Sequence, residues 1–121
     1  MSADFNFVKK MGNIFKLYFD ESSGQIYCCK YCYCHFTSEK NIVSTAFNGH
    51  FGKAYLVDLV LNVFEGTYKE TEMSSGSYVV CDIFCVQCRD IVGWKYRKSY
   101  QIDQKYKEGK YVLEVTRIRQ E

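Results

Sequence analysis

The chain has 121 residues, a net charge of +2 and 47% hydrophobic residues. This length and composition are typical of one globular domain with a modest core, which excludes a mainly disordered protein. No uncharged apolar segment approaches the roughly 18 residues that a transmembrane helix needs, and the first residues lack the apolar core of a secretory signal, so we expect neither membrane nor secretory segment. The small net charge does not by itself indicate a polyanionic partner.

The first part of the chain is expected to hold a short extension and a hairpin. Residues 1–10 are expected to form a loosely ordered N-terminal extension, followed by one domain over residues 11–121. Strands are predicted over 13–19 and 25–28, joined by a polar, glycine-containing turn at 20–24.

The middle of the chain carries its richest strand pattern, over residues 53–64. The density of valine and the flanking aromatic residues favour strand over helix there, either as two segments or as one strand bent by a bulge. Residues 38–41 are polar and fit a single helical turn. A polar connection is predicted over 65–76, and a further strand over 77–84.

The last third of the chain predicts strands over 91–96 and 110–118. Between them, residues 99–107 are expected to form a short helix, with Gly109 at its C-terminal cap. The predicted fold class is therefore mainly β, a single antiparallel β-sheet domain of about seven to nine strands with one or two short helices.

Seven cysteines are an unusual number for a chain without a secretory signal. In a reducing compartment, cysteines serve as metal ligands or free thiols more often than as disulfides, and an odd number argues against a closed disulfide framework. Two C-x-x-C pairs stand out, Cys29 with Cys32 and Cys85 with Cys88. Each pair lies where a strand, a tight turn and a second strand are expected, as in a zinc knuckle. Two such turns supply the four thiolates that a structural Zn²⁺ takes in a tetrahedron.

Other cysteines near these pairs leave an alternative ligand set open. Cys34 follows the first pair so closely that it is an alternative thiolate ligand, whereas His35 is expected to hydrogen-bond beside the turn. Cys28 is expected to face the other side of its strand, and Cys81 to be a small core residue. A redox C-x-x-C motif is followed by a helix, and neither pair has one, which disfavours redox catalysis.

Longer segments extend the two pairs into a specific pattern. These segments are Tyr27-x-Cys29-x-x-Cys32-x-x-His35, Phe47-x-Gly49-x-x-Gly52-Lys53-Ala54-Tyr55-Leu56, Asp82-Ile83-Phe84-Cys85-x-x-Cys88, Gly93-Trp94-Lys95-Tyr96 and Gln104-Lys105-Tyr106-Lys107-Glu108-Gly109-Lys110-Tyr111. With them, the chain resembles the Yippee-like family over roughly residues 11–115, and the 52 residues between Cys32 and Cys85 equal the spacing of that family. The resemblance implies a zinc-stabilised β-tent, a fold similar to the ligand-binding domain of cereblon and to the B-type methionine sulfoxide reductases.

The resemblance also implies ligands, partners and a location. One structural Zn²⁺ is expected on Cys29, Cys32, Cys85 and Cys88. Unidentified protein partners are expected, in a ubiquitin-ligase or a mitotic or nuclear assembly, with a nuclear or cytoplasmic location. By analogy with cereblon, the candidates for an aromatic cage that holds flat or cationic groups are Trp94, Tyr96 and Tyr78. The alternative for Trp94 is an ordinary core position.

The leading hypothesis is a non-enzymatic protein-interaction module. Four thiolates leave no open metal position, and neither His35 nor His50 has a nucleophile partner in a recognisable motif. A sulfoxide reductase needs a cysteine after the zinc set, and none follows Cys88. Nucleic-acid binding is the other alternative, because residues 95–121 hold eight basic and four acidic side chains interleaved with tyrosines. An ordinary solvated face would show the same pattern, so a nucleic-acid partner is less favoured than a protein.

Overall fold

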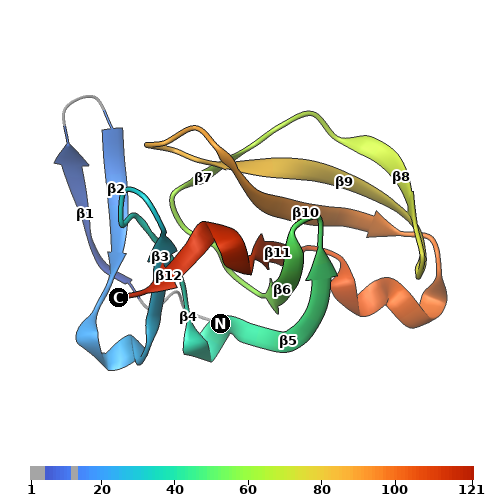
Figure 1. Ribbon diagram of the computed structural model, residues 1–121, viewed down its shortest axis with the longest axis horizontal. Coiled ribbons are helices and arrows are strands. Elements are labelled where there is room, and N and C mark those ends of the chain that lie inside the picture. The colour runs from blue at the N-terminus through green and yellow to red at the C-terminus, as the bar shows by residue number, and fades with distance from the viewer. Residues whose placement is uncertain (1–4, 12–13) are drawn as a thin grey trace.

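The computed structural model describes residues 5–11 and 14–121, whose regular structure is mainly antiparallel strands (Figure 1). These residues form three sheets, of two, seven and three strands. Helical segments in the same two ranges are short 3-10 turns, and none is long and apolar enough to cross a membrane. The prediction of a mainly β, antiparallel domain with only short helices is confirmed, but the described residues form twelve strands where about seven to nine were expected.

The seven-stranded sheet runs in the order β5, β6, β11, β10, β9, β7, and β8 pairs with the first half of β9. Its strands are β5 (Ile42–Gly49), β6 (Gly52–Val57), β7 (Val63–Glu65), β8 (Lys69–Met73), β9 (Gly76–Cys85), β10 (Ile91–Ser99) and β11 (Tyr111–Glu114). The region expected as one or two strands over 53–64 is two segments, β6 and β7. Asn62, with φ of 61°, turns the chain just before β7 begins.

Two smaller sheets lie at the opposite end of the molecule from β8 (Figure 1). β1 (Phe5–Met11) pairs with β2 (Ile14–Phe19), so the expected loose extension contains a strand. Residues 1–4 lie outside the described residues, and the domain boundary after residue 10 stays a prediction. The three-stranded sheet has the order β12 (Ile118–Gln120), β3 (Ile26–Cys29), β4 (His35–Ser38).

Two of the four described 3-10 turns, η2 (Glu39–Asn41) and η3 (Ile102–Lys107), fall at the expected helical positions. The other two are η1 (Glu21–Ser23) and η4 (Val115–Arg117). The helix predicted over 99–107 is the shorter η3, and Gly109 follows it with φ of 81°, as a C-terminal cap requires. Two expectations are wrong. The polar connection over 65–76 contains β8, and the strand over 110–118 is broken by η4 into β11 and β12.

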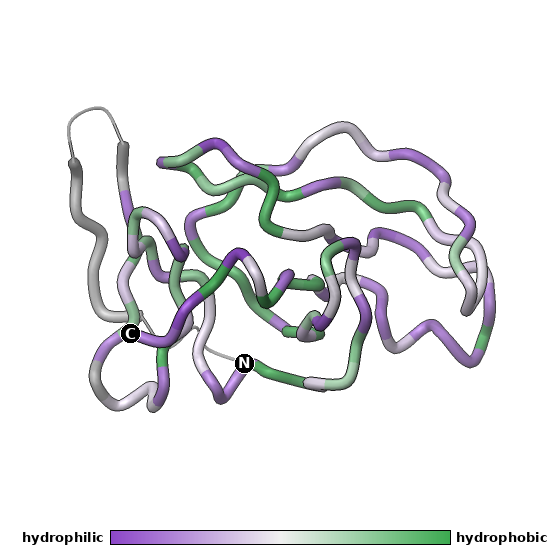
Figure 2. Tube along the Cα trace, in the orientation of Figure 1, coloured by the Kyte–Doolittle hydropathy of each residue, from purple (hydrophilic) through white to green (hydrophobic). Residues whose placement is uncertain are grey.

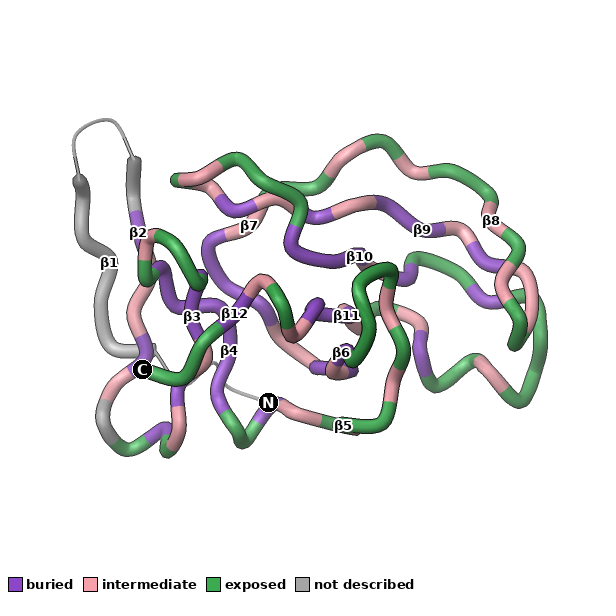
Figure 3. Tube along the Cα trace, viewed as in Figure 1, coloured by how far each residue is buried: buried purple, intermediate pink, exposed green. Residues whose placement is uncertain are grey.

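Each face of the large sheet carries an apolar cluster, because alternate residues of its central strands point to opposite faces. Ile83 and Leu113 belong to one cluster with Phe36 of β4, which places that cluster between the large and the three-stranded sheets. Val80 lies three residues before Ile83 on β9, and Val112 lies one residue before Leu113 on β11. Both therefore point to the opposite face and belong to the second cluster. Apolar and buried segments accordingly gather toward the middle of the molecule (Figures 2 and 3).

Candidate metal centre and aromatic cavity

The first C-x-x-C segment lies in the turn between β3 and β4. The backbone N–H of Cys29 donates to the carbonyl of Cys34 at 2.8 Å, and the N–H of Tyr33 donates back to the carbonyl of Cys29 at 3.0 Å. Tyr33 adopts a positive φ of 66°, which closes the turn within a few residues. This closure places Cys29 and Cys32 on the same side of the turn.

The second segment, between β9 and β10, repeats this backbone design. The N–H of Cys85 donates to the carbonyl of Asp90 at 3.0 Å, the N–H of Arg89 donates to the carbonyl of Cys85 at 2.8 Å, and Arg89 has φ of 65°. The N–H of Cys88 also points at the Cys85 sulfur, 3.5 Å away. Two segments that are distant in sequence therefore form equivalent turns, each built around a C-x-x-C pair.

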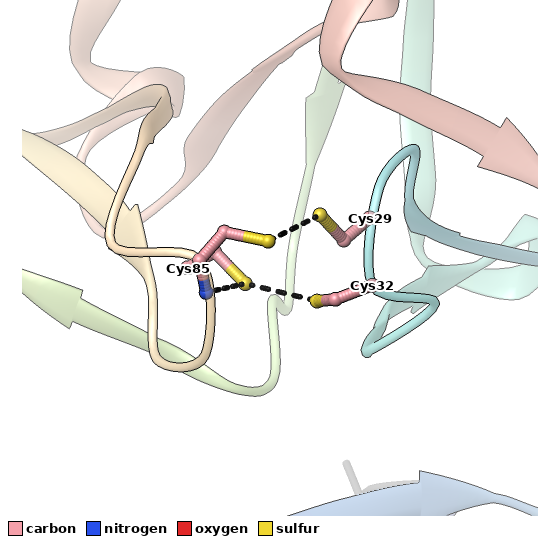
Figure 4. A group of neighbouring side chains, drawn as sticks. Cys29, Cys32 and Cys85 are labelled. Carbon is pink, nitrogen blue, oxygen red and sulfur yellow. Dashed lines mark hydrogen bonds between the residues drawn. The ribbon is translucent and has the colours of Figure 1, made fainter.

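The two turns face each other and bring four sulfur atoms together (Figure 4). The Sγ atoms of Cys29, Cys32, Cys85 and Cys88 all lie within 4.8 Å of one another. The Cys29 and Cys88 sulfurs are 3.7 Å apart, and those of Cys32 and Cys85 are 3.6 Å apart. A tetrahedral zinc site with metal–sulfur bonds of about 2.3 Å has sulfur–sulfur edges of about 3.8 Å. The cluster therefore has the dimensions that a Zn²⁺ ion requires.

The cluster joins two sheets. Cys29 and Cys32 come from the three-stranded sheet and its turn, whereas Cys85 and Cys88 come from the central hairpin of the large sheet. The two C-x-x-C pairs therefore belong to different sheets. A metal ion here would fix the relative position of these sheets over the apolar cluster that they share.

Cys34 lies outside this group of four. In the repeated backbone design it occupies the place of Asp90, whose carbonyl and not its side chain closes the turn. Its thiol is buried, and its hydrogen bond with Cys85 raises the pKa of Cys34 and lowers the pKa of Cys85 to about 5. Burial raises the pKa of Cys88. A divalent cation would reverse that effect, because a metal-bound thiol is deprotonated.

The residues flanking the cluster behave largely as expected. His35 is buried, accepts a hydrogen bond from the N–H of Phe19 at its Nδ1, and contacts the Glu121 carboxylate through Nε2 at 2.7 Å. Because Nδ1 is the acceptor, Nε2 carries the proton and donates to Glu121. Cys28 is buried against the Arg119 carbonyl, and burial raises its pKa to about 11. Cys81 is a buried core residue on β9.

The three predicted cage residues lie together, but they are not equivalent. Trp94 and Tyr96 of β10 have ring centroids 6.3 Å apart, and those of Tyr96 and Tyr78 are 4.9 Å apart. Trp94 and Tyr96 line a cavity of about 560 Å³ between β5, β8 and the hairpin of β9 and β10. Tyr78 is fully buried, and its hydroxyl hydrogen-bonds with other side chains. Whether these residues bind a ligand stays a prediction.

Lys107 at the end of η3 also lines this cavity, and sequence reasoning missed it. It is only 5% exposed. Its Nζ donates to the hydroxyls of Tyr78 at 3.0 Å and Ser75 at 3.2 Å. Nothing in the local sequence distinguishes Lys107 from the other lysines of a charged segment, because its burial depends on the distant aromatic residues around it.

The loop that joins β5 to β6 closes one side of the cavity. The buried Glu114 carboxylate accepts the backbone N–H groups of His50 at 2.8 Å and Phe51 at 3.3 Å. The His50 ring then lies 5.2 Å from the Trp94 ring. Sequence reasoning placed Glu114 only in an alternating strand, and the loop that it holds is a tertiary feature.

Basic side chains elsewhere stack over aromatic rings. The pairs are Arg97 with Tyr68, Lys98 with Tyr100, Arg119 with Tyr33, and Arg117 with Phe51, at 4.7 to 5.0 Å from the ring centroids. These pairs spread over several elements instead of forming one continuous strip along the C-terminal segment.

Comparison with known proteins identifies a matching family model and relatives of this chain. A family model described as "Yippee zinc-binding/DNA-binding /Mis18, centromere assembly" matches residues 25–120. A Solanum tuberosum protein named "Protein yippee-like" is 47% identical over 108 residues, which cover 89% of this chain and 81% of that protein. The Homo sapiens "Protein yippee-like 3" is 36% identical over 104 residues, covering 86% of this chain and 87% of that protein.

A solved structure gives independent evidence for the fold. The crystal structure of the Mis18 "Yippee-like" domain superposes with a TM-score of 0.63, covering 80% of this chain and 94% of that one at 13% identity. At this identity the likeness concerns the fold alone. Taken with the family model and the relatives, it confirms the resemblance seen in the sequence, and the chain belongs to the Yippee/Mis18 family.

Proposed function

We propose that the chain is a non-catalytic protein-interaction module over residues 11–121, held by one structural Zn²⁺. The ligands are Cys29, Cys32, Cys85 and Cys88. The observation that supports this most directly is the convergence of four thiols within 4.8 Å from two equivalent turns. A closed set of four sulfur ligands suits a structural zinc and leaves no position for a substrate.

Elemental analysis of the purified full chain, with thiol counting after denaturation, tests this proposal. We expect one zinc per chain and all seven cysteines reduced. The Cys85→Ser variant should lose zinc and unfold. The Cys34→Ser variant changes a cysteine that is not in the ligand set, and it should retain both zinc and fold. Zinc loss in Cys34→Ser with retention in Cys85→Ser would refute the ligand set. A metal-free native chain with disulfides would instead favour redox chemistry.

The cavity lined by Trp94 and Tyr96 is the proposed ligand site of the module. Replacing Trp94 with alanine separates this role from a core role. A folded, zinc-loaded variant that no longer binds its partner supports the ligand site, whereas a loss of about 3–5 kcal/mol of stability is the cost of deleting a core aromatic.

The cellular setting belongs to the same proposal and is supported by family membership. We propose a subunit of a larger assembly, of the ubiquitin-ligase or the mitotic or nuclear kind, in the nucleus or cytoplasm. Size-exclusion chromatography of a cell extract should place the tagged chain far above its own 14.2 kDa. Elution at the monomer mass would contradict a stable assembly.

Nucleic-acid binding is the second candidate function. The family description includes DNA binding, and four basic side chains on different elements stack over aromatic rings. Single-stranded DNA binding by such residues should weaken steeply with salt, because each phosphate contact releases counterions. A titration at several salt concentrations decides between the two. Absent or salt-insensitive binding leaves the protein-interaction module alone.

A further inference from the structure

Four aromatic rings beside the cavity already surround a cation, the ammonium group of Lys107. Its Nζ lies 5 to 6 Å from several ring centroids, within the range of cation–π contacts. The rings are those of Phe47 at 5.2 Å, Tyr78 at 5.1 Å, Tyr96 at 5.5 Å and Tyr106 at 5.9 Å. An external cation would therefore have to compete with a charge that the chain itself supplies.

The charge of Lys107 has no acidic partner in the part of the chain that the structure describes. The ion pairs of lysine there involve Lys95, Lys105 and Lys110, each with a carboxylate within 4.0 Å. An ammonium group has three N–H donors, and two of them reach the hydroxyls of Tyr78 and Ser75. Burying a charge that no carboxylate balances is costly, and the third N–H of this ammonium group is available to a ligand.

An unpaired donor lines the same cavity. The indole Nε1 of Trp94 is buried and is the one described buried side-chain N or O atom that lacks a hydrogen-bond partner. Trp94 and Lys107 both line the cavity. Buried donors without partners are rare in folded proteins, and each needs an explanation. A ligand that accepts hydrogen bonds would supply a partner for the Trp94 indole N–H and for the remaining N–H of Lys107 on the same cavity wall.

We propose that this cavity binds a carboxylate carried on an apolar body, with Lys107 Nζ and the Trp94 indole N–H as donors. The inference rests on the proposed ligand cavity and specifies what that cavity takes. A peptide C-terminus and a small free carboxylic acid share this chemistry. The apolar body is suited to the remaining wall, to which Phe47, Met73 and Val80 contribute.

The charges of the lining favour a singly charged anion over a phosphate dianion. Lys107 is the buried cation of the lining, which also holds the exposed Lys69 and the acids Glu72 and Asp82. Asp82 lies opposite Trp94 in the strand register. It is four residues from Tyr78 along β9, a distance of roughly 13 Å at about 3.3 Å per residue. Asp82 therefore leaves the Lys107 end positive, but the described lining holds no second buried cation to match another negative charge on a ligand.

A matched pair of probes tests the inference on the zinc-loaded full chain. N-acetylphenylalanine carries the carboxylate, and N-acetylphenylalaninamide has the same body without the charge. We expect the acid to bind at least about tenfold more tightly than the amide, the factor that a charge-assisted hydrogen bond supplies. Binding is followed by titration calorimetry and by backbone amide shifts. Short peptides with free or amidated C-termini form a second pair.

Variants assign the selectivity to the proposed donors. Lys107→Met keeps the apolar stem and should abolish the preference for the acid. Lys105→Met removes the same charge from a side chain that is half exposed and outside the cavity, and should keep the preference. Trp94→Phe keeps a ring and removes the N–H donor, and should weaken acid binding several-fold. Zinc content and thermal unfolding of each variant report whether it is folded, and Trp94→Phe remains informative if Lys107→Met does not fold.

The outcomes separate this inference from the proposed function. Equal affinity for acid and amide, or a preference that survives in Lys107→Met, overturns carboxylate recognition but leaves a ligand cavity. No shift with any probe at about 10 mM, where even weak affinities register, overturns both the carboxylate and the cavity. Zinc content tests the module independently of either. Binding of the peptide acid alone supports a chain terminus as ligand, and binding of both acids supports a free carboxylic acid as well.

Discussion

Replacing Asn62 with alanine is expected to weaken the junction between the two smaller sheets and the large one. Asn62 is 9% exposed, directly precedes β7, and hydrogen-bonds to strands β2 and β4. Its Oδ1 accepts from the N–H of Leu17 at 2.8 Å. Its Nδ2 donates to the carbonyls of Leu17 at 2.8 Å and His35 at 2.7 Å. One side chain thus satisfies three backbone groups on two strands.

The expected loss combines two effects. Three hydrogen bonds with net values of about 1 kcal/mol each disappear. Asn62 also has φ of 61°, a conformation that asparagine tolerates and that costs alanine roughly 1 kcal/mol more. The sum is about 3–5 kcal/mol, which is a large part of the stability of a domain this size, commonly about 5–15 kcal/mol.

Urea unfolding at a fixed free zinc concentration measures this loss. Asn62→Gly is the matched control, because it removes the same hydrogen bonds but tolerates the positive φ. It should therefore be about 1 kcal/mol more stable than the alanine variant. Asn62→Asp keeps the acceptor but sets a carboxylate against two carbonyls, which raises the folded-state pKa of the new carboxyl group. Its stability should therefore rise as the pH falls through that pKa.

A loss below about 1 kcal/mol in Asn62→Ala would refute this reasoning, because water would then satisfy the three backbone groups as well as the amide does. Equal stability of the alanine and glycine variants would refute only the contribution of the backbone conformation.

Three further changes have expected outcomes. Gly93→Ala places a Cβ against the backbone carbonyl of Val112 on the neighbouring strand, so we expect a loss of about 3 kcal/mol or more by urea unfolding, and a stable variant would contradict the close approach. Glu114→Gln weakens the bonds to His50 and Phe51, and should speed hydrogen exchange at these two amides while zinc content stays unchanged. A chelator should unfold the chain, and zinc should be lost more readily as pH falls because thiolates become protonated; a native spectrum after zinc removal would contradict a structural role.

The cluster of four cysteines was predictable because its signal is local. A C-x-x-C pair needs only a tight turn to direct two sulfurs to one point, and two such pairs need only to meet. The structure adds the equivalence of the turns, which explains why Cys34 is set apart from the four cysteines whose sulfurs converge. In the sequence, Cys34 is two residues from Cys32 and carries the same chemistry. Its exclusion becomes evident only when its backbone is seen to match Asp90.

The elements that the sequence missed depend on distant partners. β8 is mostly exposed and polar, so it has no apolar alternation, and its pairing with β9 is what makes it a strand. The apolar pattern over 110–118 continues across η4, because β11 joins the large sheet and β12 joins the three-stranded one. Lys107 is recognisable as special only once the rings around it are in place.

The two proposed sites of the domain lie on opposite faces of the large sheet. Cys85 ends β9 in the cluster shared with the three-stranded sheet, whereas Trp94 and Tyr96 of the same hairpin belong to the cluster on the other face. The metal would therefore hold the sheets together from one side, while the cavity is built on the opposite side from residues of the large sheet and η3. Because the two sites share the hairpin but not its faces, a cavity variant such as Lys107→Met can change recognition without touching a metal ligand.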